Sequence, residues 1–427
     1  MTLPPSPAIS NLRIDPDRLM ASIMQSAKIG ATARGGIDRL ALTELDREVR
    51  DWFAAACRAA GCSVTVDALG NIFARRPGRD DSLPPIAMGS HLDTQPTGGK
   101  YDGVIGVLAG LEVLRALNDA GVVTEAPLEV IDWTNEEGSR FAPAMLASGV
   151  FGGVFPPDYA YARTDRDGVR FDAALDAIGY RGAAPCGGRP LGAYFELHIE
   201  QGPILENEQK TIGVVTGVQG MRWYEATVTG TDSHAGTTPM TLRRDALLGA
   251  ARIIQAVHDL ALAHGPEAVG TVGLIEARPN SRNVIPGEVF LTIDLRHPDD
   301  AVVAAMEGGL RAAVDRIAVQ DKLGVTLDCT WDSPAVHFDA DCIAAVREAA
   351  AAQGLAARPI TSGAGHDAAY VARVAPTAMI FVPCAGGVSH NEAELAEPDD
   401  IAAGANVLLH AVLATDARLA NTDRPRR

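Results

Sequence analysis

The chain has 427 residues, of which 47% are hydrophobic and 21% are charged, as is typical of a globular protein with two or three domains. Acidic residues outnumber basic ones by 54 to 37, giving a formal net charge of −17. This charge disfavours nucleic acid or an anionic membrane as a partner.

The six cysteines are scattered without CxxC spacing in a long chain, so we expect reduced thiols rather than a disulfide framework. The N-terminal stretch "MTLPPSPAISNLRIDPDRLM" lacks the apolar centre of a signal peptide. No stretch reaches the roughly 18 apolar residues of a membrane helix. We therefore expect a cytoplasmic protein.

The first part of the chain alternates helical and extended patterns. Helices are predicted over 16–30 and 41–60, the second with a Thr and Glu at its start and a Gly at its end. Apolar extended segments follow in "CSVTVDALGNIFARRPG", "PIAMGSHLDT" and "PLEVIDWTNEEG". The helix-length segment "DGVIGVLAGLEVLRALNDAG" separates the last two, which is typical of an α/β sheet with crossover helices.

The pattern changes near Gly213. Residues 213–332 show the order β-α-β-β-α-β, that of a ferredoxin-like split βαβ unit. Helical and extended segments of the first type return after residue 332. The sequence therefore predicts one α/β domain, residues 1–212 and 333–427, interrupted by a smaller inserted α+β domain.

Candidate ligands for a metal follow the apolar strand of "MGSHLDTQPTGGKYDG". His91 and Asp93 alternate onto one side of an extended chain, and Asp93 is placed to hold the second ring nitrogen of His91. Asp102 follows a glycine-rich loop at the start of a helix. An Asp at the start of a helix fits an ordinary N-cap equally well.

The pair Glu136 and Glu137 ends the apolar run "LEVIDWTNEEG". Hydrolysis assisted by a metal needs one carboxylate as a ligand and another, unligated, as the general base. Adjacent side chains point in different directions and could divide these roles. Taken alone, the pair fits two solvated acids in a loop at least as well.

Two further histidines lie near strand ends: His198 in "YFELHIEQGPILE" and His390 in "FVPCAGGVSHNEAELAEPDD". Together with His91, Asp102 and Glu137 they make five nitrogen and oxygen ligands, enough for two metal ions that share a carboxylate. Imidazole and carboxylate ligands without thiolate suit Zn, Mn, Co or Ni.

At this point the chain resembles the amidase/hydantoinase/carbamoylase branch of the two-metal aminoacylase and carboxypeptidase superfamily, from about residue 15 to 415. The motifs that carry the resemblance are "GSHLDTQPTGGKYDGVIGV", "TNEEGSRF", "ELHIEQGPILE", "TDSHAGTTPM", "RPNSRNVIPGEVFLTIDLRH", "SGAGHDA" and "SHNEAE". That branch holds N-carbamoyl-L-amino-acid amidohydrolases, β-ureidopropionases and allantoate amidohydrolases. The resemblance implies a mixed-sheet, exopeptidase-like catalytic domain and an inserted dimerisation or lid domain that forms a homodimer.

The resemblance also implies roles for the ligands. Asp102 would bridge two ions, with His91 and His198 completing one ligand set, and Glu137 and His390 the other. Glu136 would then be the general base.

The inserted domain contributes its own polar residues. The resemblance implies that His234 reaches the partner's active site and polarises the scissile carbonyl, although the residue also fits a loop at a helix start. It implies that Arg296 grips the substrate carboxylate, a task suited to a two-pronged donor, with an exposed ion pair as the alternative. Asn283 and Gln201 would contact the substrate.

Residues of "SGAGHDA" are less defined. Ser362 and Gly363 are candidates to line the substrate pocket, or they form only a loop before a helix. The sequence assigns no role to His366.

We therefore expect hydrolysis of a linear amide or ureido bond in a small carboxylated substrate, such as an N-carbamoyl-L-amino acid, N-carbamoyl-β-alanine or allantoate. A dipeptidase or aminoacylase with the same metal centre is the first alternative. A metal-binding regulatory protein without activity is a remote one.

Overall fold

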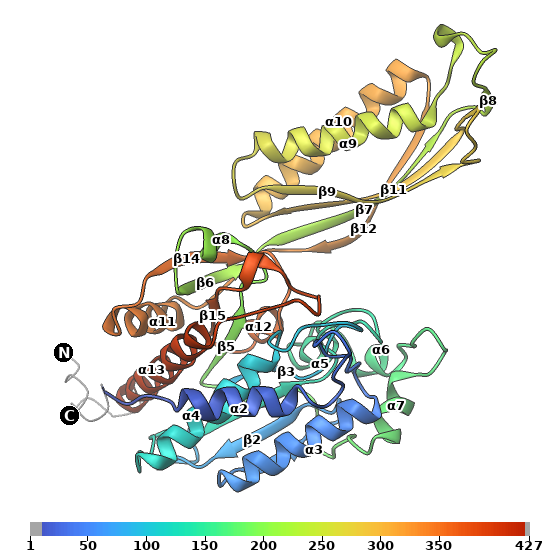
Figure 1. Cartoon of the computed structure of the whole chain (residues 1–427). Coiled ribbons are helices and arrows are strands. Elements are labelled where there is room, and N and C mark those ends of the chain that lie inside the picture. Colours follow the sequence, from blue (N-terminus) through green and yellow to red (C-terminus); the bar gives the residue numbers. More distant parts are fainter. Residues whose placement is uncertain (1–10, 423–427) are drawn as a thin grey trace. The chain divides into compact units, whose positions relative to one another are not determined.

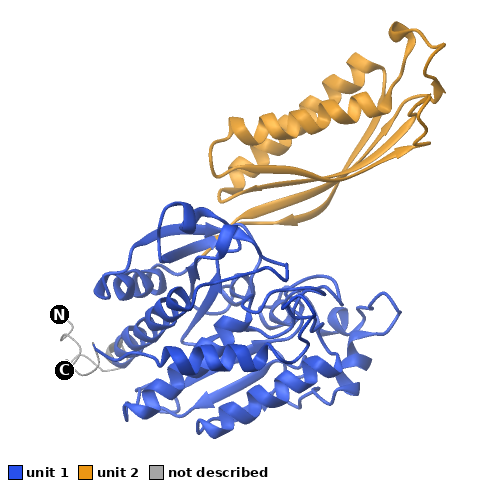
Figure 2. Cartoon of the chain, in the orientation of Figure 1, with its two compact units in different colours: residues 1–217, 338–427 blue, residues 218–337 orange. Residues whose placement is uncertain are grey.

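The computed structural model describes residues 11–422, which form two compact units joined by two chain connections (Figures 1 and 2). Unit 1 comprises residues 1–217 and 338–427, and unit 2 comprises residues 218–337. The N-terminal stretch from which we inferred the absence of a signal peptide lies partly outside the described residues.

Among the described residues, unit 1 is built on a nine-stranded mixed sheet in the order β1-β2-β4-β3-β5-β15-β6-β13, with β14 paired to β6. Strands β4, β3, β5 and β15 run parallel, whereas the pairs β1–β2, β2–β4 and β15–β6 are antiparallel. The strands are β1 (Ser63–Val66), β2 (Ile72–Arg76), β3 (Ile86–His91), β4 (Leu128–Trp133), β5 (Ala193–Ile199), β6 (Ile212–Val218), β13 (Val336–His337), β14 (Ala357–Ser362) and β15 (Thr377–Val382).

Helices cover this sheet because its central strands are apolar on both faces. Helix α4 (Val104–Asp119) packs on β3 and β5, and α13 (Pro398–Thr422) packs on α4 and β15. The core includes every apolar side chain of α4. The other helices of unit 1 are α2 (Pro16–Ser26), α3 (Glu44–Ala59), α5 (Leu146–Phe151), α6 (Pro157–Tyr161), α7 (Phe171–Ala177), α8 (Ile204–Asn207), α11 (Ala340–Ala352), α12 (Asp367–Val371) and the 3-10 turn η2 (Ala385–Gly387).

Unit 2 has a four-stranded antiparallel sheet in the order β12-β7-β11-β9, with two helices on one face. This is the ferredoxin-like order, and the predicted β-α-β-β-α-β arrangement is present. Its elements are β7 (Gly220–Thr229), β8 (Ser233–His234), η1 (Met240–Leu242), α9 (Ala246–Ala263), β9 (Val269–Arg278), β10 (Val284–Ile285), β11 (Glu288–His297), α10 (Asp300–Asp321) and β12 (Gly324–Ser333).

The boundaries of unit 2 differ from those predicted. The sequence placed residues 213–217 in the inserted domain, but β6 pairs with β15 through Gly213, Val214 and Val215 and so belongs to the sheet of unit 1. Residues 333–337 are grouped with unit 2 instead, although β13 (Val336–His337) within them pairs with β6 of the large sheet. An alternating strand pattern shows that a strand exists but not which sheet it joins, which explains the shift.

Helix α9 departs from another expectation. It has 18 residues with a mean hydropathy of 1.3, so by length and composition it could cross a membrane, although we had expected no such segment. Ala250, Ile253 and Val257 on one face of it are buried in the core of unit 2. A single helix of this kind is weak evidence for a membrane span, since core helices share the same composition.

Candidate metal centre

The five predicted ligands meet at one edge of the unit 1 sheet. Strands β3, β4, β5 and β15 are parallel, so their carboxyl ends lie at the same edge. His91 ends β3, and His198 lies one residue before the end of β5. Glu137 follows β4, and His390 lies in the loop that follows β15. Asp102 lies just before α4, which starts at this edge.

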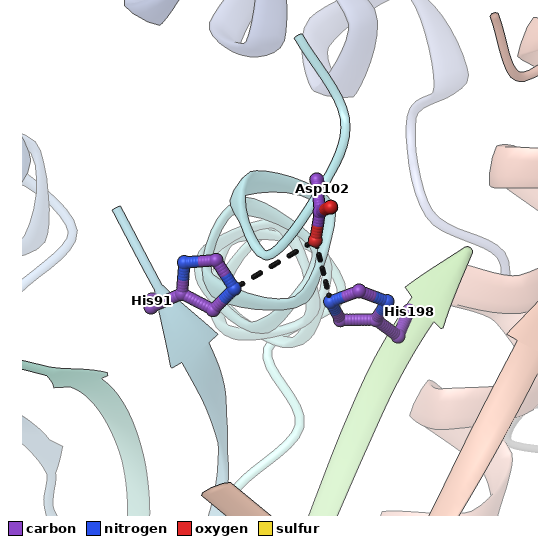
Figure 3. Close-up of side chains that lie close together, drawn as sticks. All are labelled: His91, Asp102 and His198. Carbon is purple, nitrogen blue, oxygen red and sulfur yellow. Dashed lines mark ion pairs between the residues drawn. The ribbon is translucent and has the colours of Figure 1, made fainter. Parts of the chain in front are cut away.

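The first ligand group consists of His91, Asp102 and His198, all of them buried (Figure 3). Oδ1 of Asp102 lies 3.1 Å from Nε2 of His198 and 3.8 Å from Nε2 of His91. One ligand atom from each residue lies within 4.8 Å of the others. This spacing allows three ligands to surround one cation.

The second group consists of Asp102, Glu137 and His390. Oδ2 of Asp102 lies 3.4 Å from Nε2 of His390, which in turn is 3.5 Å from Oε2 of Glu137. Asp102 therefore turns one carboxylate oxygen toward each group. Two groups that share a carboxylate in this way match the ligand set of a centre with two metal ions.

Asp102 is not the N-cap of α4. The cap position is Gly103, with φ +66, and no side chain caps this helix end. The alternative that Asp102 merely caps a helix is therefore wrong. Gly103 is required here because a Cβ on it would lie 2.3 Å from Nε2 of His91.

The two buried histidines have the ring orientation that a metal ligand needs. Nδ1 of His91 lies 2.8 Å from the carbonyl oxygen of Asp93, and Nδ1 of His198 lies 3.0 Å from that of Ile199. A ring nitrogen facing a carbonyl carries the proton, so Nε2 keeps its lone pair. Both lone pairs are directed toward Asp102.

Asp93 lies beside the second ring nitrogen of His91, as the sequence predicted, and its backbone carbonyl is the acceptor. The carboxylate instead accepts the backbone N–H of Glu136 at 3.2 Å and that of Glu137 at 3.3 Å. It therefore fixes the turn that presents the two adjacent glutamates.

The side chains of both glutamates are enclosed rather than solvated, since that of Glu137 is only 5% exposed, so the alternative of two solvated acids is wrong for them. Glu136 is 7% exposed and belongs to neither ligand group, while its Oε2 lies 3.5 Å from Nε2 of His91. Burial, followed by the charge of Asp367, raises the pKa of Glu136 well above its usual value. Burial and the charge of Asp102 do the same for the pKa of Glu137.

The histidines are perturbed in opposite directions. Burial lowers the pKa of His91 to about 4. Burial alone would also lower the pKa of His198, but its hydrogen bond to Asp102, together with the charges of Asp102 and Glu196, outweighs burial and raises it to about 9. The three histidines together hold the pKa of Asp102 below its usual range despite its burial. Several carboxylates gathered around these histidines make a site that a divalent cation would stabilise.

Sequence reasoning missed three residues that support the ligands. The backbone N–H of Gln95 donates to Oε1 of Glu137 at 3.1 Å, and its side-chain amide donates to Oε2 at 2.7 Å. Ser389 lies 2.8 Å from Oδ2 of Asp102. Glu394 accepts the backbone N–H of Asp102 at 3.1 Å. All three lie inside the motifs quoted above, but a motif does not show which neighbours touch a ligand.

Gln201 lies directly beside the shared carboxylate. Its Nε2 is 2.9 Å from Oδ2 of Asp102 and 3.4 Å from Nε2 of His390, and its buried Oε1 has no hydrogen-bond partner. Gln201 and His390 both have left-handed backbone conformations, with φ +58 and +53. Such conformations in residues other than glycine are typical of functional sites.

The segment that begins at Ser362 also lies near the first ligand group. Ser362 is buried, and its hydroxyl bonds with the backbone of Ala364 and lies 3.0 Å from Nε2 of His366. The His366 ring lies 4.5 Å from that of His198 and is fully buried. The hydroxyl of Ser362 is thus engaged within its own loop.

The predicted residues of unit 2 fall into two places. His234 in β8 pairs with Val284 in β10, and the N–H of Ala235 donates to the carbonyl of Asn283, so His234 and Asn283 are neighbours. Arg296 lies near the other end of β11, opposite Met221, where Asp294 binds its guanidinium at 2.7 Å.

Comparison with known proteins places this centre in a family. The profile of peptidase family M20/M25/M40 matches residues 87–414. The chain belongs to peptidase family M20/M25/M40. Within it, the chain is 50% identical over 405 residues to the N-carbamoyl-L-amino-acid amidohydrolase of Rhizobium meliloti, covering 95% of this chain and 97% of that relative.

Other relatives in the M20 family agree. The allantoate amidohydrolase of Bacillus subtilis is 36% identical, covering 90% of this chain and 93% of that relative. The crystal structure of an amidase of the hydantoinase/carbamoylase family from Burkholderia multivorans is 58% identical, with a TM-score of 0.93, covering 95% of this chain and 99% of that structure. These relatives confirm the predicted fold class and a metal-dependent amidohydrolase of this M20 branch.

Proposed function

We propose that this chain hydrolyses the ureido C–N bond of an N-carbamoyl-L-amino acid, releasing the amino acid, ammonia and carbon dioxide. The observation that carries the proposal is Asp102, whose two oxygens face two separate ligand groups. The printed activity of the relative that is 50% identical supports this substrate class over allantoate, whose named relative is 36% identical.

Two divalent ions, held by His91, Asp102, His198, Glu137 and His390, would lower the pKa of the attacking water and polarise the scissile carbonyl. Zn, Mn, Co or Ni fits these ligands. Glu136 then takes the proton of that water, because its buried carboxylate lies beside His91 outside both groups. Glu136 then passes the proton to the leaving nitrogen.

Unit 1 and unit 2 each contribute candidate substrate contacts. Gln201 presents its unsatisfied Oε1 at the metal centre and donates to the substrate through its amide when that group turns. Arg296 binds the substrate carboxylate, and Asp294 holds the guanidinium in place until then. His234 and Asn283 contact the carbonyl being cleaved. Ser362 and Gly363 line the pocket through their backbone, since the Ser362 hydroxyl is engaged.

The separation within unit 2 supports a homodimer. Glu288, beside β10, pairs with Thr229, whereas Arg296 pairs with Met221 eight residues further along β11. That length of strand spans about 26 Å. One small substrate cannot contact both ends of this sheet, so His234 and Arg296 must come from different subunits if both act on it.

The edge of unit 2 offers a surface for that dimer. Strand β9 lies at the edge of its sheet and exposes Val269, Leu274 and Ile275, each between 41% and 45%. Leu262 on the neighbouring α9 is 70% exposed. An apolar, exposed edge strand is suited to pair with a second copy of itself.

The decisive experiment is a panel of substrates assayed after the protein has been stripped and reloaded with Zn, Mn, Co or Ni. We expect ammonia release from N-carbamoyl-L-amino acids at a kcat/KM at least about tenfold above that for N-carbamoyl-β-alanine, allantoate, N-acetyl amino acids and dipeptides. Faster cleavage of N-acetyl amino acids or dipeptides would favour the aminoacylase or dipeptidase alternative. No hydrolysis with any of the four metals would favour the inactive alternative.

A further inference from the structure

Glu394 has no role in the chemistry above, yet its carboxylate is 5% exposed beside the metal centre. Oε1 accepts the backbone N–H groups of Tyr101 at 3.0 Å and Asp102 at 3.1 Å. Oε2 lies 3.0 Å from the hydroxyl of Ser389, which is also 2.8 Å from Oδ2 of Asp102. One side chain thus contacts both the segment that carries Asp102 and the segment that carries His390.

The fit around this carboxylate is close. A Cβ on residue 99 would lie 2.0 Å from Oε1 of Glu394. The loop before Asp102 can therefore come this close to the carboxylate only with glycine at that position. The two segments are nearly 300 residues apart in sequence. Their contact is needed because the second ligand group takes Asp102 from one segment and His390 from the other.

We infer that Glu394 is a positioning residue for the second metal ion: it fixes the backbone at Asp102 and the Ser389 hydroxyl, and thereby sets the distance between Oδ2 of Asp102 and His390. The inference rests on the proposed centre with two metal ions. The first group depends less on Glu394, because its two histidines lie on the neighbouring strands β3 and β5.

The test is metal affinity, measured by competition with a chromophoric chelator and by the visible spectrum of the protein loaded with Co²⁺. In Glu394→Ala we expect the affinity for the second ion to fall by about 10- to 100-fold, the usual effect of removing a partner that orients a ligand. Affinity for the first ion should change less. Glu394→Gln should restore binding, because its oxygen still accepts both N–H groups and its amide can donate to Ser389.

Asp416 provides a matched control, since its buried carboxylate also accepts two consecutive backbone N–H groups, from Glu125 and Ala126, which precede β4, whereas Glu137 follows it. Asp416→Ala should lower the melting temperature and leave both metal affinities unchanged. Ser389→Ala, which removes only the hydroxyl, is a second variant in case Glu394→Ala does not fold. It should also lower the affinity for the second ion.

Unchanged affinity for the second ion in Glu394→Ala, or an equal loss in Asp416→Ala, would overturn the inference while the metal centre stands. Glu394→Gln binding as weakly as Glu394→Ala would also overturn it. If the unsubstituted protein binds fewer than two ions, the proposed centre itself fails and the inference fails with it.

Discussion

Two adjacent glutamates at the end of β4 have different surroundings. Gln95 binds both oxygens of Glu137, which faces His390, whereas Glu136 faces His91 from outside the ligand groups. Asp93 holds the backbone of both. The proposed function assigns Glu137 to the ligand set and Glu136 to proton transfer, in line with these surroundings.

This division predicts the effect of Glu136→Gln. Metal content should stay unchanged, because Glu136 is not a ligand, while kcat falls at least about 100-fold through loss of the base. Metal analysis and single-turnover assays on the same preparation check both parts. Glu137→Gln is the control and should lose the second ion. Activity above a tenth of the unsubstituted level in Glu136→Gln would rule out this base.

The second prediction at the residue scale concerns Arg296. Arg296→Ala should raise KM for carboxylated substrates at least about tenfold, because a charge-assisted pair is lost, with a smaller effect on kcat. Arg278→Ala, which removes an exposed ion pair with Glu288 in the same sheet, should change neither constant. An equal effect on uncharged ureido compounds would argue against a carboxylate clamp.

At the scale of elements, the start of α4 connects fold and chemistry. The helix packs beneath the parallel strands and begins where they end, so the turn before it carries Asp102 into the edge where β3 and β5 present their histidines. Gly103 permits that turn and leaves room for His91.

Gly103→Ala should therefore disrupt the site from within the fold. Its Cβ collides with the His91 ring, so we expect affinity for the first ion to fall at least about tenfold. Gly121→Ala is matched, since Gly121 follows the other end of α4 with φ +63 and has no atom within 4 Å of an added Cβ. Gly121→Ala should lower the stability of the fold only through backbone strain, by about 1–2 kcal/mol. Similar metal affinities in both variants would contradict this account.

At the scale of the whole molecule, the proposed dimer predicts that each active site needs residues of both subunits. Neither His234→Ala nor Glu136→Gln homodimers should turn over substrate. Mixed dimers should recover up to about half of the activity of an unsubstituted dimer if His234 acts in trans, since one of two sites is then complete. Heterodimers verified by two affinity tags and still inactive would show that His234 acts within its own subunit.

The buried charges predict how pH and metal act on stability. Burial raises the pKa of Asp93, Asp132 and Glu394 to about 7, and those of Glu136 and Glu137 rise as well. Between about pH 4.5 and 7 the folded protein without metal thus binds more protons than the unfolded chain, and its stability falls as pH rises. His91, with a pKa lowered to about 4, acts in the opposite direction but is outnumbered.

We therefore expect the metal-free protein to melt at a lower temperature at pH 7.5 than at pH 5.5. Saturating divalent metal should raise the melting temperature more at pH 7.5, where the carboxylates are free of protons. Calorimetry at both pH values, with and without metal, measures this. An equal gain at the two pH values would show that these carboxylates do not govern metal binding.

The sequence by itself determined the features that depend on local pattern. Alternation and helical period identify β3, β4, β5, β15 and α4, and a ligand-type residue near each strand end predicts where the site lies. The ferredoxin-like order of the inserted unit follows from the same periods. These features depend only on residues that are close together in the sequence.

Only the tertiary structure decided contacts between distant segments. Asp102 does not cap α4, and the Asp93 carboxylate accepts the backbone N–H groups of Glu136 and Glu137. Strand β6 belongs to the large sheet of unit 1. The tertiary structure also brings Glu394 to the backbone of Asp102. The physical reason is that hydrogen-bond partners far apart in sequence are chosen by packing, and residue type and spacing do not encode which of several acceptors a buried N–H will reach.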